Sequence, residues 1–395
     1  MQNTCEHFGR CGGCTYLNIP YPKELAVKEQ YLRDTLGEYS RFFQKLHPAP
    51  AQSGYRNKME LAFGDDGKDG NLALGMRKKR SFYEVATPTD CVLITDDLKK
   101  IIRYVLEYFQ NNGEAFYHRK RHIGSLRHLV LRRGEFTGEI LLNLSTTSTL
   151  ATPLQPLIDG LLSLPLDGKI IGFLHSVNDG VADAVKNENI SLLYGRDYYN
   201  EEICGLKFKV SAFSFFQTNS AGAEVLYGLV KDYAASDANS LAYDLYCGTG
   251  TIAQILSPNF NKIIGIELVE DAIKAAKANA ELNGITNCDF YAGDVLEVVR
   301  DLQDDESKEV FDCSDSRPDA VVLDPPRDGL HPKAVPHILA LNTPLLVYVA
   351  CKPQSLARDL VLLKQAGYKV EKIEGVDMFP RTQHVEAIAL LRRQA

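Results

Sequence analysis

Cys351 lies in the segment VYVACKP (347–353), between an apolar run and a Lys-Pro pair. Most cysteines are buried packing residues, but a thiolate is also a nucleophile that can form covalent intermediates. The apolar run predicts a parallel strand ending at Cys351, and Pro353 suits the first turn of a helix over 354–366. We expect the positive end of that helix, together with Lys352, to favour the thiolate. Cys351 is therefore the first candidate catalytic residue.

A second set of residues has the spacing of a nucleotide site. LAYDLYCGTGT (241–251) predicts a strand ending in a tight turn, and Gly248-x-Gly250-x-x-Ala253 fits the loose dinucleotide-binding fingerprint. Glu267 ends the next predicted strand, 19 residues after Gly248, where an acid can hold ribose hydroxyls. Ligands bind at this end of such strands, so a nucleoside-bearing cofactor is expected. The fingerprint alone leaves an NAD-linked oxidoreductase open.

Two further acids follow predicted strands. Asp324 begins DPPRDG, and the two prolines fix the orientation of the loop that carries it. At the edge of a sheet beside a cofactor, such a loop suggests a rigid platform for a planar substrate. Asp294, in AGD, is placed for another polar contact, although an Asp there is also a common helix cap.

The elements that must position these residues alternate in the second half of the chain. Apolar segments at 241–247, 262–268, 319–326 and 344–351 are separated by helical stretches, which predicts an α/β, doubly wound, parallel sheet over 211–395. Between 54 and 210, short β-rich segments separated by Gly, Asn and Asp predict a largely antiparallel arrangement. We expect a β-rich domain over 1–210, which also contains an amphipathic helix at 23–37.

Charge is distributed unevenly. The whole chain has a net charge of −7, but residues 1–133 hold 22 Lys and Arg against 15 Asp and Glu. Two basic runs, 76–80 and 117–133, lie in this part and favour a polyanion as partner. Basic runs are also often plain solvated surface. Together with Arg56 and Lys58, the 117–133 run is expected to hold phosphates.

No apolar run approaches the roughly 18 residues needed to cross a bilayer, and the N-terminal residues lack a signal-peptide pattern. Nine cysteines without an export signal indicate metal binding or catalysis more than disulfides. A cytoplasmic protein without a membrane partner is expected. Cys5, Cys11 and Cys14 have the spacing C-x5-C-x2-C, which by itself allows zinc, an iron–sulfur cluster or three unrelated thiols.

Five ordered segments carry a more specific signal: DLYCGTGT, GIELVEDAI, LDPPRDGL, YVACKPQSLARDL and HVEAIALLR. In order and spacing they resemble the RNA 5-methyluridine methyltransferase family, as do YRNKMELAF (55–63) and FSFFQTN (213–219). The resemblance implies a class I methyltransferase fold and methyl transfer from S-adenosylmethionine to C5 of a uridine in RNA. It also implies that helix 23–37 packs on the methyltransferase domain. The cofactor-binding residues that it implies are Gln217, Tyr246, Thr251, Glu267, Asp294 and Asp324.

The family's chemistry gives the remaining residues their roles. Uracil C5 is a poor nucleophile until a thiolate adds to C6, and the resemblance makes Cys351 that nucleophile. It makes Glu386, in HVE, the base that then removes the C5 proton. The target uracil must leave the RNA stack before the enzyme can reach it, and Phe215 is a candidate stacking partner for the extruded uracil. This chain departs from the usual pattern at Ala350 and Lys352, where the family has serine and asparagine.

The resemblance also bears on the cysteines and on the RNA. Its rRNA-modifying members have a three-plus-one pattern, with the fourth ligand matching Cys91, so a [4Fe–4S] cluster on Cys5, Cys11, Cys14 and Cys91 is favoured over zinc. The tRNA-modifying branch generally lacks this cluster, which favours 23S rRNA over tRNA as substrate. We expect a monomer that lacks the family's N-terminal β-barrel, and we expect Cys204, Cys247, Cys288 and Cys313 to be packing or surface thiols. An NAD-linked oxidoreductase and a non-catalytic iron–sulfur RNA-binding protein remain as alternatives.

Overall fold

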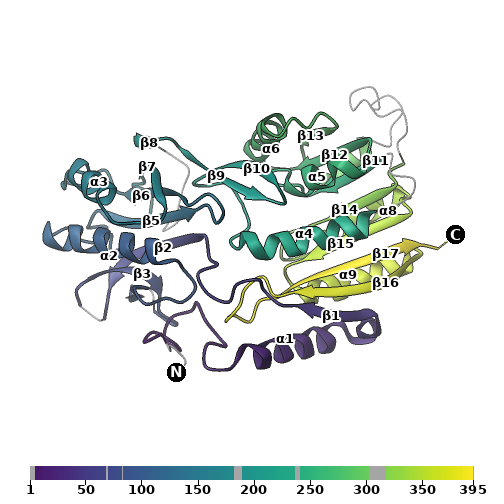
Figure 1. Cartoon of the computed structure of the whole chain (residues 1–395), viewed down its shortest axis with the longest axis horizontal. Helices are drawn as coiled ribbons and strands as arrows, with labels where there is room; N and C mark the ends of the chain where they lie inside the picture. Colours follow the sequence, from purple (N-terminus) through teal and green to yellow (C-terminus); the bar gives the residue numbers. More distant parts are fainter. Residues whose placement is uncertain are drawn as a thin grey trace.

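The chain is described by a computed structural model over residues 5–67, 70–81, 83–181, 189–235, 241–301 and 317–394. Figure 1 shows two sheets side by side. One has eight strands in the order β1-β16-β17-β15-β14-β11-β12-β13, and the other has seven in the order β4-β3-β2-β5-β6-β7-β8. A separate hairpin pairs β9 (Tyr198–Ile203) with β10 (Leu206–Ser211).

The eight-stranded sheet is buried on both faces. Val347 and Val349 face one core cluster, whereas Leu346 and Tyr348 of the same strand face another. This alternation is the period of two expected of a strand, and it explains the continuous apolar runs in the sequence. The strands are β1 (Phe43–His47), β11 (Leu241–Leu245), β12 (Lys262–Glu267), β13 (Cys288–Ala292), β14 (Ala320–Leu323), β15 (Leu345–Ala350), β16 (Tyr368–Val376) and β17 (Glu386–Arg393).

Helices cover both faces of this sheet, as the doubly wound prediction requires. One face is packed by α4 (Ser220–Ala234), α5 (Thr251–Leu256) and α6 (Glu270–Leu282). The other is packed by α1 (Tyr21–Leu36), α7 (Val295–Asp301), α8 (Ala334–Ala340) and α9 (Pro353–Gln365). No helix in the described part of the chain is long and apolar enough to cross a membrane.

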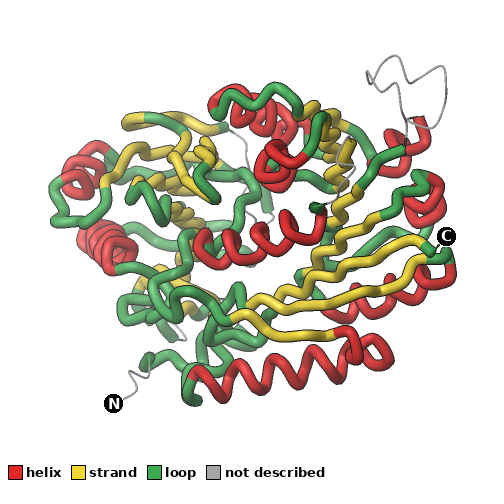
Figure 2. The backbone as a smooth tube through the Cα atoms, turned by 45° about the vertical axis from the view of Figure 1, so that its right-hand side comes forward, coloured by secondary structure: helices red, strands yellow, loops and turns green. Residues whose placement is uncertain are grey.

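Helix α1 lies far from the other elements of this sheet in sequence but next to them in space. Leu32 and Leu36 of α1 belong to the core cluster of the sheet's second face, and β1 pairs in parallel with β16. Figure 2 shows this helix running alongside the sheet. The early helix therefore packs on the eight-stranded sheet, although residues 58–211 separate it from most of that sheet in sequence.

The seven-stranded sheet is antiparallel except between β6 and β7. Helix α2 (Asp96–Asn111) covers one face with Leu98, Ile101, Ile102, Val105 and Phe109, which recur at helical spacing. Helix α3 (Gln155–Leu162) packs beside α2. The strands are β2 (Lys58–Asp65), β3 (Leu72–Arg77), β4 (Val85–Ala86), β5 (Leu126–Arg133), β6 (Glu139–Thr146), β7 (Lys169–Val177) and β8 (Ile190–Gly195).

A buried ion cluster ties α1 to the loop between β16 and β17. Lys28, which is 1% exposed, donates to Glu24 at 2.9 Å, to Asp377 at 2.7 Å and to the Phe379 carbonyl at 3.1 Å. The Tyr21 hydroxyl donates to the other carboxylate oxygen of Asp377 at 2.9 Å. A cation that leaves water must have such partners, so the early helix and the late loop hold each other in one geometry.

Replacing Lys28 with methionine should destabilise the fold strongly, because the buried Asp377 would lose its cation and the buried Glu24 would keep only Arg381, at 3.4 Å. The expected loss is about 3–5 kcal/mol, the range for removing one partner of a buried pair. Urea unfolding at neutral pH measures it. Lys23→Met, at an exposed position of the same helix, is the control and should change the free energy of unfolding little. An equally small effect of Lys28→Met would contradict the importance of the cluster.

Candidate active site

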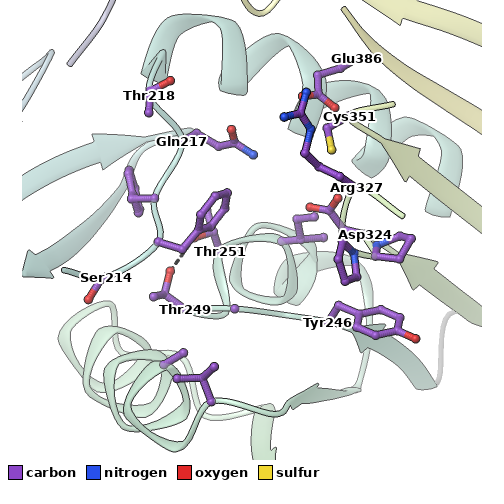
Figure 3. Close-up of a pocket in the computed structure, with 18 of the residues that line it drawn as sticks. Ser214, Gln217, Thr218, Tyr246, Thr249, Thr251, Asp324, Arg327, Cys351 and Glu386 are labelled. Carbon is purple, nitrogen blue, oxygen red and sulfur yellow. Dashed lines mark hydrogen bonds between the residues drawn. The ribbon is translucent and has the colours of Figure 1, made fainter. Parts of the chain in front are cut away.

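A cavity of about 1240 Å³ lies at the carboxyl ends of the central strands. Figure 3 shows Cys351, Glu386, Arg327 and Asp324 gathered at one side of it, with Gln217 facing them from the other. All eight catalytic and cofactor-binding candidates line this one cavity: Gln217, Tyr246, Thr251, Glu267, Asp294, Asp324, Cys351 and Glu386. Residues spread over 170 positions of sequence are therefore brought together, and five of them, Tyr246, Glu267, Asp294, Asp324 and Cys351, end or follow parallel strands, where ligands of such sheets bind.

The turn after β11 forms one wall of the cavity. Tyr246, Gly248 and Gly250 have φ values of 68°, 54° and 72°, so the chain turns through the left-handed region three times. A Cβ at Gly250 would lie 2.6 Å from the Phe290 ring, whereas nothing lies within 4 Å of a Cβ at Gly248. Gly250 thus permits close packing, and Gly248 leaves room for a ligand. Asp244, a residue that the sequence analysis missed, accepts a hydrogen bond from the Ala253 amide at 2.9 Å and holds the turn.

Two of the predicted acids are held by backbone amides. Glu267 accepts from the Gly248 amide at 3.1 Å with one oxygen and from the Val269 amide at 3.0 Å with the other. Each oxygen keeps a further lone pair that can accept a hydrogen bond from a hydroxyl group. Asp294 accepts from the Leu296 amide at 2.8 Å and lines the cavity as well. The helix-cap and ligand-contact interpretations of Asp294 are therefore compatible.

The catalytic corner depends on strand direction. Strand β17 runs antiparallel to β15, and Ala350 pairs with Ala387 in their register. Continuing this register by one residue sets Cys351, which directly follows β15, opposite Glu386, the first residue of β17. Asp324 follows β14, the other neighbour of β15. A thiol and two carboxyl groups therefore meet at one edge of the sheet.

The electrostatics of this corner disfavour charge. Burial, followed by the nearby Asp324, raises the pKa of Glu386 to about 8, while Arg327 opposes the shift. Burial raises the pKa of Asp324 to about 7. Burial, Glu386 and Asp324 raise the pKa of the Cys351 thiol to about 11. The expected stabilisation of the thiolate does not agree with this direction. Lys352, the cation expected to help, lies 3.8 Å from the exposed Asp328 instead.

Arg327 is the charged residue of this corner that the sequence analysis did not assign. It follows the two prolines, and its Nη2 lies 3.5 Å from Nδ1 of His384. Its loop is fixed from α9, because the buried Asp359 accepts from the Leu330 amide at 2.8 Å and from the Tyr348 hydroxyl at 2.6 Å. The signal was present in the sequence, since DPPR places a cation directly beside the rigid loop.

The four predicted cluster ligands also come together. Cys5, Cys11, Cys14 and Cys91 line a second, small cavity of about 50 Å³, and the Gly13 amide donates to the Cys11 sulfur at 3.3 Å. Burial, followed by the charges of Cys91, Cys11 and Cys5, raises the pKa of Cys14 to about 12. Among the described residues, no group of three or more His, Cys, Asp or Glu side chains is arranged as a metal site.

The basic run 117–133 proves to be mixed. Arg127 and Arg132 are 2% and 1% exposed, and Arg132 donates to the Ala212 carbonyl at 2.9 Å and to the Ser214 carbonyl. The expectation that the whole run contacts phosphate is wrong for Arg132. Its guanidinium instead binds backbone carbonyls of the segment that leads to Phe215 and Gln217. Both of these residues line the cavity.

The described members of the remaining cysteines are either surface or packing thiols, as predicted. Cys204 is exposed, whereas Cys247 and Cys288 are buried. Cys247 also lines the large cavity. Cys313 lies outside the described residues.

The sequence profile of the tRNA (uracil-5-)-methyltransferase family matches residues 186–394, more than half of the chain. The chain belongs to the RNA uracil-5 methyltransferase family. It is thus an S-adenosylmethionine-dependent enzyme that acts on RNA, and the fingerprint after β11 is that of a methyltransferase rather than of an NAD-linked oxidoreductase. The expected class I methyltransferase fold is confirmed.

Similarity to relatives of this uracil-5 methyltransferase extends along almost the whole chain. It is 41% identical over 397 residues to an uncharacterized RNA methyltransferase of Clostridium tetani, covering 100% of this chain and 84% of the relative. A counterpart in Bacteroides thetaiotaomicron is 35% identical, covering 98% and 87%. The solved tRNA (uracil-54, C5)-methyltransferase of Pyrococcus abyssi, in complex with S-adenosyl-L-homocysteine, is 27% identical with a TM-score of 0.77, covering 97% of this chain and 86% of that one.

The raised pKa of Glu386 predicts a stability change with a definite sign. Between its ordinary pKa of 4.5 and about 8, the folded chain keeps a proton that the unfolded chain has released. The stability that this group contributes is therefore full below pH 4.5 and is lost as the pH rises through 8. Glu386→Gln, which cannot ionise, should be more stable than the wild type at pH 8 by roughly 1–3 kcal/mol and equally stable near pH 4.5.

Urea unfolding at both pH values tests this expectation. Glu371→Gln removes an exposed carboxylate that pairs with Arg392 and should show no such gain at pH 8. If the Glu386 and Glu371 variants respond to pH alike, the carboxyl of Glu386 is not held protonated by its surroundings.

Proposed function

We propose that this enzyme methylates C5 of a uridine in 23S rRNA through a covalent bond between Cys351 and C6 of the base. The observation that carries the proposal is the placement of Cys351 opposite Glu386, at the end of a cavity whose other walls carry the cofactor candidates. A nucleophile and a base on one substrate ring need this arrangement, because they act at neighbouring carbon atoms.

The cofactor candidates suit S-adenosylmethionine. Gly248 leaves open space at the turn, and Glu267 is oriented to accept ribose hydroxyls. Gln217, Tyr246, Thr251, Asp294 and Asp324 would complete the site. When bound, S-adenosylmethionine supplies an electrophilic methyl group.

The side chains of the catalytic corner then have distinct tasks. Cys351 loses its proton to solvent water and the thiolate adds to C6, which moves the electron pair of the C5–C6 double bond into an enolate. Arg327 opposes the raised pKa of both Cys351 and Glu386 and so favours their ionised states. Once C5 carries the methyl group, Glu386 takes the C5 proton. The C–H electron pair re-forms the double bond, the C6–S bond breaks, and the thiolate leaves.

The pKa of Glu386 suits this last step. A base is most effective when its pKa lies near the working pH, where it is both basic and ionised in a useful fraction. A pKa of about 8 meets this condition, whereas an ordinary glutamate would be a weaker base by several pK units.

Phe215 is a suitable partner for the extruded uracil. Its side chain is 72% exposed and lines the cavity, so the ring is accessible to a base that enters there. A flipped base is commonly stacked on such a ring.

The preference for 23S rRNA rests on the cysteines. We propose that Cys5, Cys11, Cys14 and Cys91 hold a [4Fe–4S] cluster next to the seven-stranded sheet, in a part of the chain, residues 1–210, that binds RNA. Four thiols on one small cavity supply the required donor number. The hydrogen bond from Gly13 to the Cys11 sulfur is of the kind that stabilises a cluster thiolate.

Glu386→Gln should trap the covalent intermediate. The variant keeps the nucleophile but lacks the base, so release should slow by roughly 10²–10⁴-fold and a methylated RNA should stay bonded to Cys351. Cells expressing the variant are lysed, the protein is purified under denaturing conditions, and the attached RNA is sequenced. The expected RNA is a segment of 23S rRNA.

Each part of the proposal has its own contrary outcome. Recovery of tRNA would replace the substrate and leave the chemistry intact. Attachment of RNA to Cys351→Ala would exclude Cys351 as the nucleophile, and normal turnover by Glu386→Gln would exclude Glu386 as the base. Glu371→Gln, the exposed control, should turn over normally and retain no RNA.

The cluster proposal predicts metal content. Protein purified without oxygen should contain about four iron and four sulfide ions per chain and a broad visible absorbance. Cys91→Ser should lose most of both, whereas Cys204→Ser, at an exposed thiol far along the chain, should lose neither. Stoichiometric zinc without sulfide would mean that the four thiols form a different site.

A further inference from the structure

The segment 212–219 joins β10 to α4 and brings an exposed aromatic ring to the catalytic cavity. Figure 3 shows this segment along the cavity wall between Ser214 and Thr218. Its adjacent rings have opposite surroundings, because Phe216 is 4% exposed and belongs to the core, whereas Phe215 is 72% exposed. An apolar ring gains free energy by leaving water. A loosely held segment would therefore turn Phe215 onto neighbouring apolar surface.

Arg132, near the end of β5, holds the first half of this segment. Its Nε donates to the Ala212 carbonyl at 2.9 Å, and its Nη2 donates to the Ser214 carbonyl. The second of these carbonyls directly precedes Phe215 in the chain. A guanidinium presents its N–H groups in one rigid plane, so a single side chain can fix two carbonyls at once. Arg132 is 1% exposed, and hydrogen bonds shielded from water in this way are strengthened.

Asn57 holds the second half of the segment. Its backbone amide donates to the Thr218 carbonyl at 2.9 Å, and its Nδ2 donates to the Gln217 carbonyl at 3.1 Å. Asn57 directly precedes Lys58, which pairs with Arg132 across β2 and β5. Neighbouring residues of the seven-stranded sheet thus fix both halves of a segment that lines the cavity of the other sheet.

We propose that Arg132 is a positioning residue for the target uracil. From the seven-stranded sheet it fixes the backbone in front of Phe215, so that this ring stays exposed in the cavity and is in place to stack on the extruded base. A ring that is already held loses little freedom when the base binds, which is the advantage of a preorganised site. The inference rests on the proposed role of Phe215 and adds to it what keeps the ring there.

The chain contains no tryptophan, so Phe215→Trp in the full-length protein introduces a single fluorescent indole at the stacking position. Quenching of its emission reports stacking on a base, and its anisotropy decay reports how firmly the ring is held. The probe is RNA from cells that lack this gene, since it contains the unmodified uridine whichever RNA carries it. S-adenosylhomocysteine is added to prevent turnover. Adding Arg132→Lys, which keeps the charge but cannot hold both carbonyls, should speed the anisotropy decay of the free enzyme and reduce the quenching by RNA.

Methyl transfer to the same RNA gives a second measurement, in chains without the introduced indole. Arg132→Lys should lower kcat/KM roughly tenfold, within the range for the loss of one stacked base. If Arg132 acts through Phe215, its replacement should change kcat/KM by less than about twofold in the Phe215→Ala background, whereas independent effects would multiply. Arg133→Lys is the control, because this next residue of β5 pairs with Asp97 at 3.4 Å instead. It should match the wild type in both measurements.

Effects that multiply, or an anisotropy decay that Arg132→Lys leaves unchanged, would overturn the proposal while the stacking role of Phe215 stands. Emission that does not respond to RNA even with Arg132 in place would remove that stacking role, and the inference with it.

Affinity for S-adenosylhomocysteine, measured by calorimetry, reports whether each variant is folded. If Arg132→Lys loses this affinity, Ser211→Ala decides. The Ser211 Oγ accepts from the Ser214 amide at 3.1 Å and bonds the Ser214 hydroxyl at 2.7 Å. Its removal should loosen the same turn, speed the anisotropy decay and reduce the quenching, and a variant that changes neither would overturn the proposal.

Discussion

The direction of one strand decides where the catalytic groups can lie. Parallel strands bring their carboxyl ends to the same edge of the sheet, so β14 and β15 deliver Asp324 and Cys351 there. A further parallel strand would start at the far edge. Because β17 is antiparallel to β15, its first residue arrives at the near edge, and the register places Glu386 opposite Cys351. The thiol and the base can therefore approach neighbouring carbon atoms of one ring.

An antiparallel strand at this position requires a connection that turns back from β16, and that connection must be rigid. Residues 377–385 are held by α1 through Lys28 and Asp377, and the Arg381 amide donates to Glu24 at 2.6 Å. Tyr55 donates to the Pro380 carbonyl at 2.8 Å. An element from the start of the chain thus fixes the position of Glu386. The same corner works against stability, because Asp324 and Glu386 are held where their charged forms are disfavoured, and only packing elsewhere can offset that cost.

The sequence was most informative where a pattern of residues is compatible with few structures. Long apolar runs separated by helices leave little choice but a parallel sheet, and polar residues at the ends of such runs must meet at one edge. That logic accounts for Tyr246, Glu267, Asp294, Asp324 and Cys351, whereas Gln217 and Glu386 came from the family resemblance. It could not find β1, the register of β17 or the burial of Arg132, because these depend on partners far along the chain. The pKa of Cys351 was misjudged for the same reason, since Lys352 is adjacent in sequence, whereas the burial that raises the pKa, and then Glu386 and Asp324, come from the packed fold.

The cysteine cavity and the catalytic cavity share a wall, and this links two features that the sequence treats as separate. Gly13, Arg56 and Met76 line both cavities. The segment that follows the cysteines is tied to the loop before Glu386, because the Thr15 and Tyr16 amides donate to the Arg381 carbonyl at 2.7 and 3.0 Å. Residues 11–16 thus contact the thiol cavity on one side and the catalytic loop on the other. Any ligand that orders the four thiols would therefore order part of the wall of the catalytic cavity at the same time.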